Sequence, residues 1–288
     1  MSTRPPSIAN TATRHASRTL RGAWLGCALL LGVAANGSAQ QGPIEVPSLK
    51  LLTTNVPERA DRLLNAGDVG KALGLLEAHL SNHPDDFEAQ WRAARAAVYM
   101  GILATGTDIE NAWYRRGIAH ADRALAERPD DPEALRWAVA SKGNLAVQTG
   151  AREAVRLTEE IWTLDHRLLK IDPNDALAHD ALGSLHYQVM KLSSFERTLG
   201  RLFMGGNILA LANWDDALKH LHKAVELAPD NILYRVDLAD ALTARGRVHE
   251  AMAQLDTAVA LPKRLPVDDD FRERAERRLA KLRRERGE

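Results

Sequence analysis

The stretch "KAVELAPDN", residues 223–231, decides the fold because three other stretches have the same form. They are "HLSNHPDD" at 79–86, "ALAERPDD" at 124–131 and "LLKIDPND" at 168–175. In each, a helix-forming run meets a proline that is followed by two Asp or Asn residues. Proline cannot continue a helix interior, and an Asp or Asn side chain can accept from the free N–H groups of the next helix. Each stretch therefore predicts a helix, a turn and a second helix.

Positions before the four prolines also repeat. Four residues before each proline stands Leu or Val, and twelve before stands Ala, Gly or Ile. These residues are Leu80, Leu125, Leu169 and Val225, and Ala72, Gly117, Ile161 and Ala217. The prolines lie 45, 44 and 56 residues apart. The tetratricopeptide unit has about 34 residues, so we expect the middle helices to be long or to carry insertions.

The composition favours helices throughout. Ala, Leu and Arg are abundant and are strong helix formers, whereas the chain has only 4 Phe and 4 Tyr. We therefore predict an all-α fold, a right-handed α-solenoid of about five antiparallel helix pairs with a C-terminal capping helix. The expected helices are 57–66, 69–82, 87–104, 107–128, 132–149, 151–171, 175–192, 194–203, 213–228, 232–245, 247–260 and 269–285.

Some turns and caps can be predicted residue by residue. Gly67 and Gly246 lie in short turns between helices, where we expect a positive φ. Thr107 with Glu110 predicts a capping box at the start of 107–128. Asn213, with Asp216 three residues later, predicts a similar cap for 213–228.

The N-terminus has the organisation of an export signal. Residues 1–39 contain four arginines and no acid, then the apolar run "GAWLGCALLLGVAA" and a small-x-small site that ends at Ala39. We expect cleavage after Ala39 and a periplasmic or secreted protein without stable membrane insertion. An uncleaved anchor is the alternative, although the run is shorter than the about 20 residues of a membrane span. A lipidated Cys27 is another.

Cleavage would leave a chain with no cysteine, 34 basic and 38 acidic residues. A net charge near −4 disfavours general nucleic-acid binding, and the absence of thiols excludes disulfides and thiolate sites. We expect a flexible lead at 40–54 and a solenoid over 55–288, with an insertion near 193–212.

Four stretches carry a family resemblance. They are "AQWRAARAAVYMG" (89–101), "GIAHADRALAERPDDPEALRWAVASKG" (117–143), "IDPNDALAHDALGSLHYQVMKLSSFERTLGRLFMGG" (171–206) and "LYRVDLADALTARGRVHEAMAQLDTAVALP" (233–262). In this order they resemble the tetratricopeptide-like family named after regulators of microtubule dynamics, over roughly 57–280. The block 179–206 is the most specific part. The resemblance implies an α-solenoid with a scaffolding or binding role, and we do not carry the microtubule role over literally.

No local motif predicts catalysis. The sequence has no Gly-rich phosphate loop, no G-x-S-x-G elbow and no H-E-x-x-H. His220 and His222 point in different directions on one helix, and His179 and His186 share a face without an acid nearby, so we predict no metal site and no cofactor. An enzyme with dispersed site residues stays an alternative.

Tryptophans and arginines are the candidate contact residues. Trp91, Trp113, Trp137, Trp162 and Trp214 are expected in the core, with the concave surface as the alternative. Arg92, Arg95 and Arg197 are expected in structural ion pairs, with binding of an acidic partner as the alternative. If a partner is bound, the candidates are Arg92, Arg95, His179 and Arg197.

The C-terminal "FRERAERRLAKLRRERGE" has eight basic and four acidic residues. Its apolar stripe is Phe271, Ala275, Leu279 and Leu282, which predicts a cap on the open end of the solenoid. Binding of a membrane surface or nucleic acid is the alternative for this segment. For the whole chain we predict an exported, non-enzymatic scaffold that binds a protein or peptide in its concave groove. The second hypothesis is a periplasmic accessory subunit of a solute-binding-protein-dependent transporter, which this repeat also distantly resembles.

Overall fold

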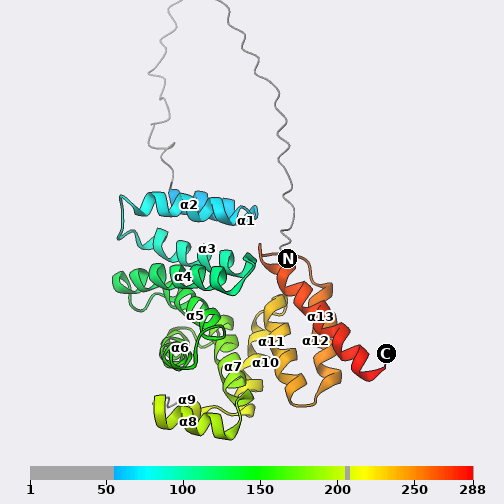
Figure 1. Cartoon of the computed structure of the whole chain (residues 1–288). Coiled ribbons are helices and arrows are strands. Elements are labelled where there is room, and N and C mark those ends of the chain that lie inside the picture. Colours follow the sequence, from blue (N-terminus) through cyan, green and yellow to red (C-terminus); the bar gives the residue numbers. More distant parts are fainter. Residues whose placement is uncertain (1–54, 205–207, 288) are drawn as a thin grey trace, which may run out of the picture. The chain divides into compact units, whose positions relative to one another are not determined.

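The structure, a computed structural model, describes residues 55–204 and 208–287, and within them the regular elements are helices without a strand (Figure 1). The expected signal peptide, its cleavage after Ala39, Cys27 and the lead 40–54 lie outside the described residues. The helices are α1 (Val56–Asn65), α2 (Val69–Leu80), α3 (Phe87–Leu103), α4 (Thr107–Glu127), α5 (Pro132–Ala146), α6 (Ala151–Ile171), α7 (Ala176–Lys191), α8 (Ser194–Met204), α9 (Ile208–Leu211), α10 (Trp214–Leu227), α11 (Ile232–Ala244), α12 (Val248–Ala260) and α13 (Asp268–Arg286).

The four Pro-Asx stretches form the predicted turns. In each copy the second Asx residue is the N-cap of the next helix, and its side chain accepts from a backbone N–H in the first turn. The bonds are Ala89 N–H to Asp86 (3.1 Å), Glu133 N–H to Asp131 (2.9 Å), Ala178 N–H to Asp175 (2.9 Å) and Tyr234 N–H to Asn231 (3.3 Å). The repeated sequence thus fixes where one helix pair ends and the next begins.

The predictions for individual turns were right except one. Gly67 and Gly246 have φ of 85° and 73°, as expected. Asn213 accepts from the Asp216 N–H at 2.8 Å and caps α10. The capping box at Thr107 was wrong, because the N-cap of α4 is Gly106 at φ 107° and lacks a side chain to accept with. Only its acidic half exists, since Glu110 accepts from the Gly106 N–H.

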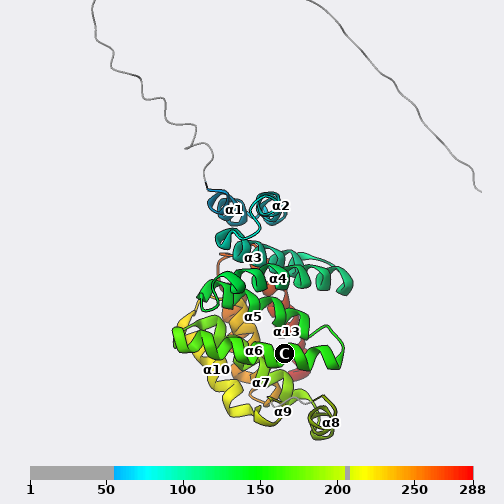
Figure 2. The same ribbon diagram turned by 90° about the vertical axis from the view of Figure 1, so that its left-hand side faces the viewer.

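Consecutive helices pack as pairs, with one exception. α1 packs on α2, α3 on α4, α5 on α6 and α11 on α12, but α7 pairs with α10. Residues 192–213, with α8 and α9, lie between the two helices of that pair. Both views place α8 beside α9, at the margin of the helical array (Figures 1 and 2). α8 and α9 thus lie in the range 193–212 where we expected an insertion, and α9 is a short helix that the sequence did not lead us to expect.

Ion pairs join successive repeats. In each, an arginine of one unit meets a carboxylate 37–39 residues away, so the partners occupy neighbouring units. The pairs are Arg115–Glu153, Arg116–Glu77, Arg136–Asp175, Arg167–Asp130 and Arg278–Asp240. They reinforce the register of the stack, while apolar burial supplies most of the stability.

The residues twelve and eight positions before each proline are buried in the units compared, and all but one of them are apolar. Twelve residues before each proline, Ala72, Ile161 and Ala217 are 0–5% exposed. Eight before, three units place Leu76, Ala121 and Leu221, each at most 1% exposed. The third unit places Asp165 there, at 0% exposure. A carboxyl group thus occupies a position that the other units give to an apolar side chain.

Candidate functional site

The inner face of the solenoid is formed by α3, α5, α7, α11 and α13, which contact one another in that order. One apolar cluster joins buried Tyr99 of α3 with Val267 and Phe271 at the start of the C-terminal helix. Trp137 of α5 and Tyr187 of α7 pack against the same cluster. The open concave groove expected from the sequence is therefore closed over these helices by the chain's own side chains.

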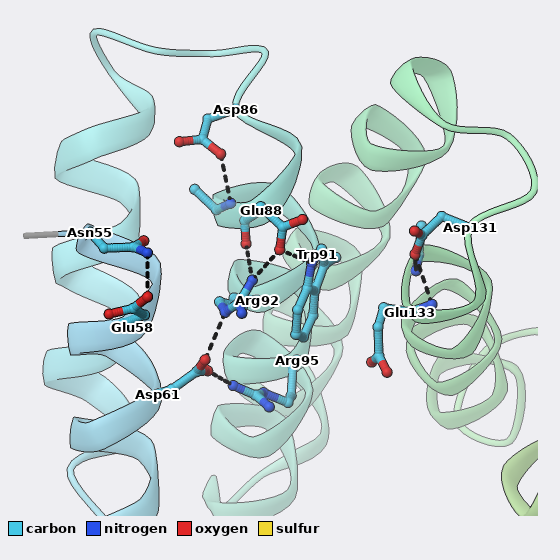
Figure 3. Close-up of polar contacts among 12 residues, drawn as sticks. Asn55, Glu58, Asp61, Asp86, Glu88, Trp91, Arg92, Arg95, Asp131 and Glu133 are labelled. Carbon is cyan, nitrogen blue, oxygen red and sulfur yellow. Dashed lines mark hydrogen bonds and ion pairs between the residues drawn. The ribbon is translucent and has the colours of Figure 1, made fainter.

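Arg92 and Arg95 of α3 are held by one carboxylate of α1. Arg92 Nε donates to Asp61 Oδ2 at 2.8 Å, and Arg95 donates to Asp61 Oδ1 (Figure 3). Arg92 also pairs with Glu88 at 2.6 Å, and its guanidinium lies 4.0 Å from the centre of the Trp91 ring. Both arginines are thus in structural ion pairs, the role we favoured for them.

Removing the shared carboxylate tests that role. We expect Asp61→Asn to lower the free energy of unfolding by about 1–2 kcal/mol, because two half-buried guanidinium groups lose a charged acceptor. Chemical denaturation of Asp61→Asn beside Asp68→Asn measures it, since among the described residues Asp68 forms its ion pair with the exposed Lys71. A loss no larger than that of Asp68→Asn would contradict the structural role.

Arg197 differs from the other candidate arginines. Its guanidinium donates to the Leu192 carbonyl at 2.5 Å and to Ser194 Oγ at 3.3 Å, both within its own segment. Neither it nor Arg201, one turn later, forms an ion pair with a described residue. The ion pair expected for Arg197 is therefore not formed within the described part of the chain.

His179, His186 and His220 meet between α7 and α10, which the sequence did not predict. His179 and His220 are 41 residues apart, and their Nδ1 atoms are 2.8 Å apart. The His186 and His220 rings stack at 6.3 Å. The expectation that His179 and His186 share a face was right, and His220 completes the cluster from the partner helix. Sequence spacing alone gives no sign of a contact between two helices.

Hydrogen bonds assign the neutral forms of these rings. His186 Nδ1 accepts from the Asn213 backbone N–H at 3.2 Å, so its proton is on Nε2. His179 Nε2 donates to the Pro173 carbonyl at 3.1 Å, so its Nδ1 accepts from His220 Nδ1–H. Both nitrogens of His179 are used within the chain.

Burial favours the neutral forms of His186 and His220. Desolvation first, and then the neighbouring His179, His186 and Lys219, lower the pKa of His220 to about 4, against a smaller opposing effect of Asp216. Burial also lowers the pKa of His186. An unfolded histidine takes up its proton near pH 6.5, so stability is present above that pH and is lost as the pH falls toward the folded pKa.

We therefore expect the wild-type chain to lose about 1–2 kcal/mol of stability between pH 7 and pH 5 through His220, after allowance for solvent screening of this half-buried ring. His220→Phe retains a ring and removes the titration, so it should lose less stability over this range. Urea unfolding of both proteins at the two pH values measures the difference. Parallel losses in the two proteins would show that His220 is not the cause.

Two buried carboxyl groups lie near the same helices. Both oxygens of Asp165 in α6 and one oxygen of Asp180 in α7 have no hydrogen-bond partner among the described residues. Desolvation raises the pKa of Asp165 well above its usual range, with a further contribution from Asp175. Desolvation and Asp237 do the same for Asp180. Burial thus favours the protonated, neutral form of both groups.

The remaining candidates are structural. Trp91 is buried, and Trp113, Trp137 and Trp162 are half-buried against apolar clusters, as expected for core residues. Trp214 contacts Tyr187. The stripe of Phe271, Ala275, Leu279 and Leu282 is buried on the last repeat, so the capping role of α13 is confirmed.

Within 55–204 and 208–287, no group of three or more His, Cys, Asp or Glu side chains has an arrangement that could hold a metal ion. In the same ranges, no helix combines the length and apolarity needed to span a bilayer.

Comparison with known proteins places this geometry in a family. The family model described as regulator of microtubule dynamics protein 1-3 matches residues 56–283. Bovine regulator of microtubule dynamics protein 3 is 25% identical over 217 residues, which cover 74% of this chain and 46% of that protein. Human regulator of microtubule dynamics protein 2 is 23% identical over 265 residues, covering 88% and 63%. The chain thus spans between about half and two thirds of the length of these relatives.

Solved structures confirm the fold class. A thermophilic tetratricopeptide-repeat protein from Thermus thermophilus superposes with a TM-score of 0.55 at 22% identity, covering 78% of this chain and 98% of that protein. The right-handed α-solenoid of tetratricopeptide type is therefore confirmed.

Proposed function

Because the chain belongs to the regulator of microtubule dynamics protein 1-3 family, we propose that it is a non-enzymatic scaffold that binds a protein or peptide partner. The single observation that supports this function is the stack of helix pairs over 56–260 with a capped end. Such a stack offers an extended surface made of many helices, and binding is the usual role of such surfaces.

The closed inner face bears on where the partner binds. Tyr99 and Asp180 are each 7% exposed, and Tyr234 is 8% exposed. A peptide cannot contact these side chains without displacing the chain's own residues. We therefore place the partner on an exposed face of the solenoid and not in the concave groove that the sequence led us to expect.

We also propose that the scaffold works outside the cytoplasm. The basic stretch, the apolar run and the small-x-small site ending at Ala39 support export. Mass spectrometry of the mature protein from its host tests this proposal. A new N-terminus at Gln40 is expected, and an intact N-terminus on cytoplasmic protein would overturn it.

Photo-crosslinking in the native host tests the binding function. A photoreactive residue is introduced at exposed positions around the stack, one position per variant, and each captured protein is then purified and its binding is reconstituted. A reproducible partner that binds the purified full-length chain is expected. If no captured protein binds after purification, and the chain instead turns over a small molecule, the scaffold function is wrong.

A further inference from the structure

His179 of α7 and His220 of α10 bring two imidazole nitrogens together across the interface between these helices. Their Nδ1 atoms are 2.8 Å apart, and their ring centres are 5.0 Å apart. Both side chains are half-buried, so solvent reaches the pair. In the chain the two residues are 41 positions apart, on either side of α8 and α9. The pair therefore links two helices that the sequence separates.

The spacing of the two nitrogens suits a transition-metal ion. Histidine nitrogens bind such ions at about 2.0–2.1 Å, so two ligands at a right angle are about 2.8–3.0 Å apart and two tetrahedral ligands about 3.3–3.4 Å apart. The Nδ1–Nδ1 distance of 2.8 Å matches the right-angled arrangement. That arrangement is typical of square-planar and tetragonal Cu²⁺ and Ni²⁺ sites, and of the divalent first-row ions Cu²⁺ binds nitrogen ligands most strongly.

Neighbouring groups orient His179 as a ligand. Its Nε2–H donates to the Pro173 carbonyl at 3.1 Å, which leaves the Nδ1 lone pair for another bond. Histidines that bind metal ions commonly donate their other N–H to a carbonyl in this way. Asp216 lies one turn before His220 on α10 and puts a negative charge on the same side of the helix. Lys219, whose charge opposes a cation, is exposed, and solvent screens it.

We propose that His179 Nδ1 and His220 Nδ1 bind one Cu²⁺ ion, which joins α7 to α10. The ion takes the place of the hydrogen bond between the rings. The proton of His220 moves from Nδ1 to Nε2, so both rings stay neutral as metal ligands must, and each ring turns toward the ion. No set of three or more His, Cys, Asp or Glu among the described residues could hold a metal ion; this site uses two protein ligands, and water supplies the others. It is independent of the proposed scaffold function.

Isothermal titration of CuCl₂ into the full-length Cys27→Ser chain, at pH 7 in a buffer that does not bind copper, tests the proposal. Cys27 is the only thiol of the sequence, and its replacement removes a competing sulfur ligand. We expect tight binding of one ion, weakened at least tenfold in His179→Gln and in His220→Gln. Pulsed electron paramagnetic resonance should detect two imidazoles on the ion in the parent chain and fewer than two in each variant. Zn²⁺, which prefers tetrahedral ligands, should bind more weakly than Cu²⁺.

His79→Gln/His83→Gln is the matched control, because it also removes two histidines that lie close together. These rings stack with their centres 4.4 Å apart. His79 Nε2 bonds to Asp86 at 2.7 Å, and His83 Nδ1 bonds to the His79 carbonyl at 3.2 Å. Their free nitrogens do not face each other, so the control should keep the affinity and the two-imidazole signal of the parent chain. Circular dichroism should show every variant folded.

Thermal unfolding gives a second measurement of the same site. An ion that binds the folded interface and not the unfolded chain stabilises the fold, so Cu²⁺ should raise the melting temperature of the parent chain more than that of His220→Gln. Equal rises, or equal affinities of the parent chain, His179→Gln and His220→Gln, would overturn the proposal and indicate an adventitious ion only. Loss of the tight binding in the His79→Gln/His83→Gln control would also overturn it. Tighter binding of Zn²⁺ than of Cu²⁺ would overturn the choice of metal.

Discussion

Gly183→Ala is expected to lower the free energy of unfolding by about 3 kcal/mol, because the site has no room for a methyl group. Gly183 lies in α7 where α10 crosses it most closely. A Cβ there would be 2.6 Å from Leu221 Cγ, 2.9 Å from Leu221 N and 3.0 Å from Ala217 O. Two of these atoms belong to the α10 backbone, so the clash can be relieved only by moving the two helices apart.

Gly143→Ala is the matched comparison. Gly143 lies inside α5, and no described atom outside its own helix backbone lies within 4 Å of the position of its Cβ. Alanine there should raise the free energy of unfolding by about 0.5–1 kcal/mol, since glycine is the poorer helix former. Urea denaturation followed by circular dichroism measures both variants. Similar effects of the two substitutions would show that α7 and α10 are not in close contact at Gly183.

Asp165→Leu is expected to raise the free energy of unfolding by about 1–3 kcal/mol at pH 7. The wild-type carboxyl is fully buried, and neither oxygen has a hydrogen-bond partner among the described residues. The same register position holds Leu76 and Leu221 in two other units, so leucine suits this place in the repeat. Removing an unsatisfied polar group and adding apolar contacts both favour the folded state.

The gain should depend on pH, with a sign that follows from the raised pKa. A carboxyl whose folded pKa is raised contributes stability below its unfolded pKa and loses it as the pH rises through the folded value. The advantage of Asp165→Leu should therefore be smallest near pH 4 and should grow toward pH 8. Asp165→Asn, which cannot ionise, should show the same trend with a smaller gain.

Thermal and urea unfolding at several pH values between 4 and 8 measures this trend. Asp270→Asn is the control, because Asp270 is only partly buried, in the first turn of α13. A destabilised Asp165→Leu at every pH would contradict the prediction and would show that the carboxyl has a partner.

Local chemistry allowed much of the fold to be predicted. The Pro-Asx turns set where α3, α5, α7 and α11 begin, because a proline and a capping side chain act on the residues beside them. The cap predicted at Thr107 was wrong and the positive φ predicted at Gly67 was right, and one property of glycine explains both results. Glycine reaches a positive φ, and at Gly106 that conformation ends the turn before the threonine.

Features that depend on two distant segments were not predicted. His179 and His220 meet only because α10 returns to α7 after the insertion. Asp165 could have been found, since the alignment on prolines sets it against Leu76, Ala121 and Leu221. The closed inner face had no sequence sign, because it depends on how far each repeat rotates relative to the one before it.

The direct pairing of α7 with α10 has a consequence for how such chains can change over time. α8 and α9 stand between α7 and α10 along the chain, and α7 and α10 pack directly on one another. Substitutions at the exposed positions of α8, such as Phe195 and Leu202, would leave the scaffold intact, whereas Ile208 and Leu209 of α9 are buried in the core. The exposed side of α8 can therefore change in sequence while the packing of the repeats is inherited unchanged.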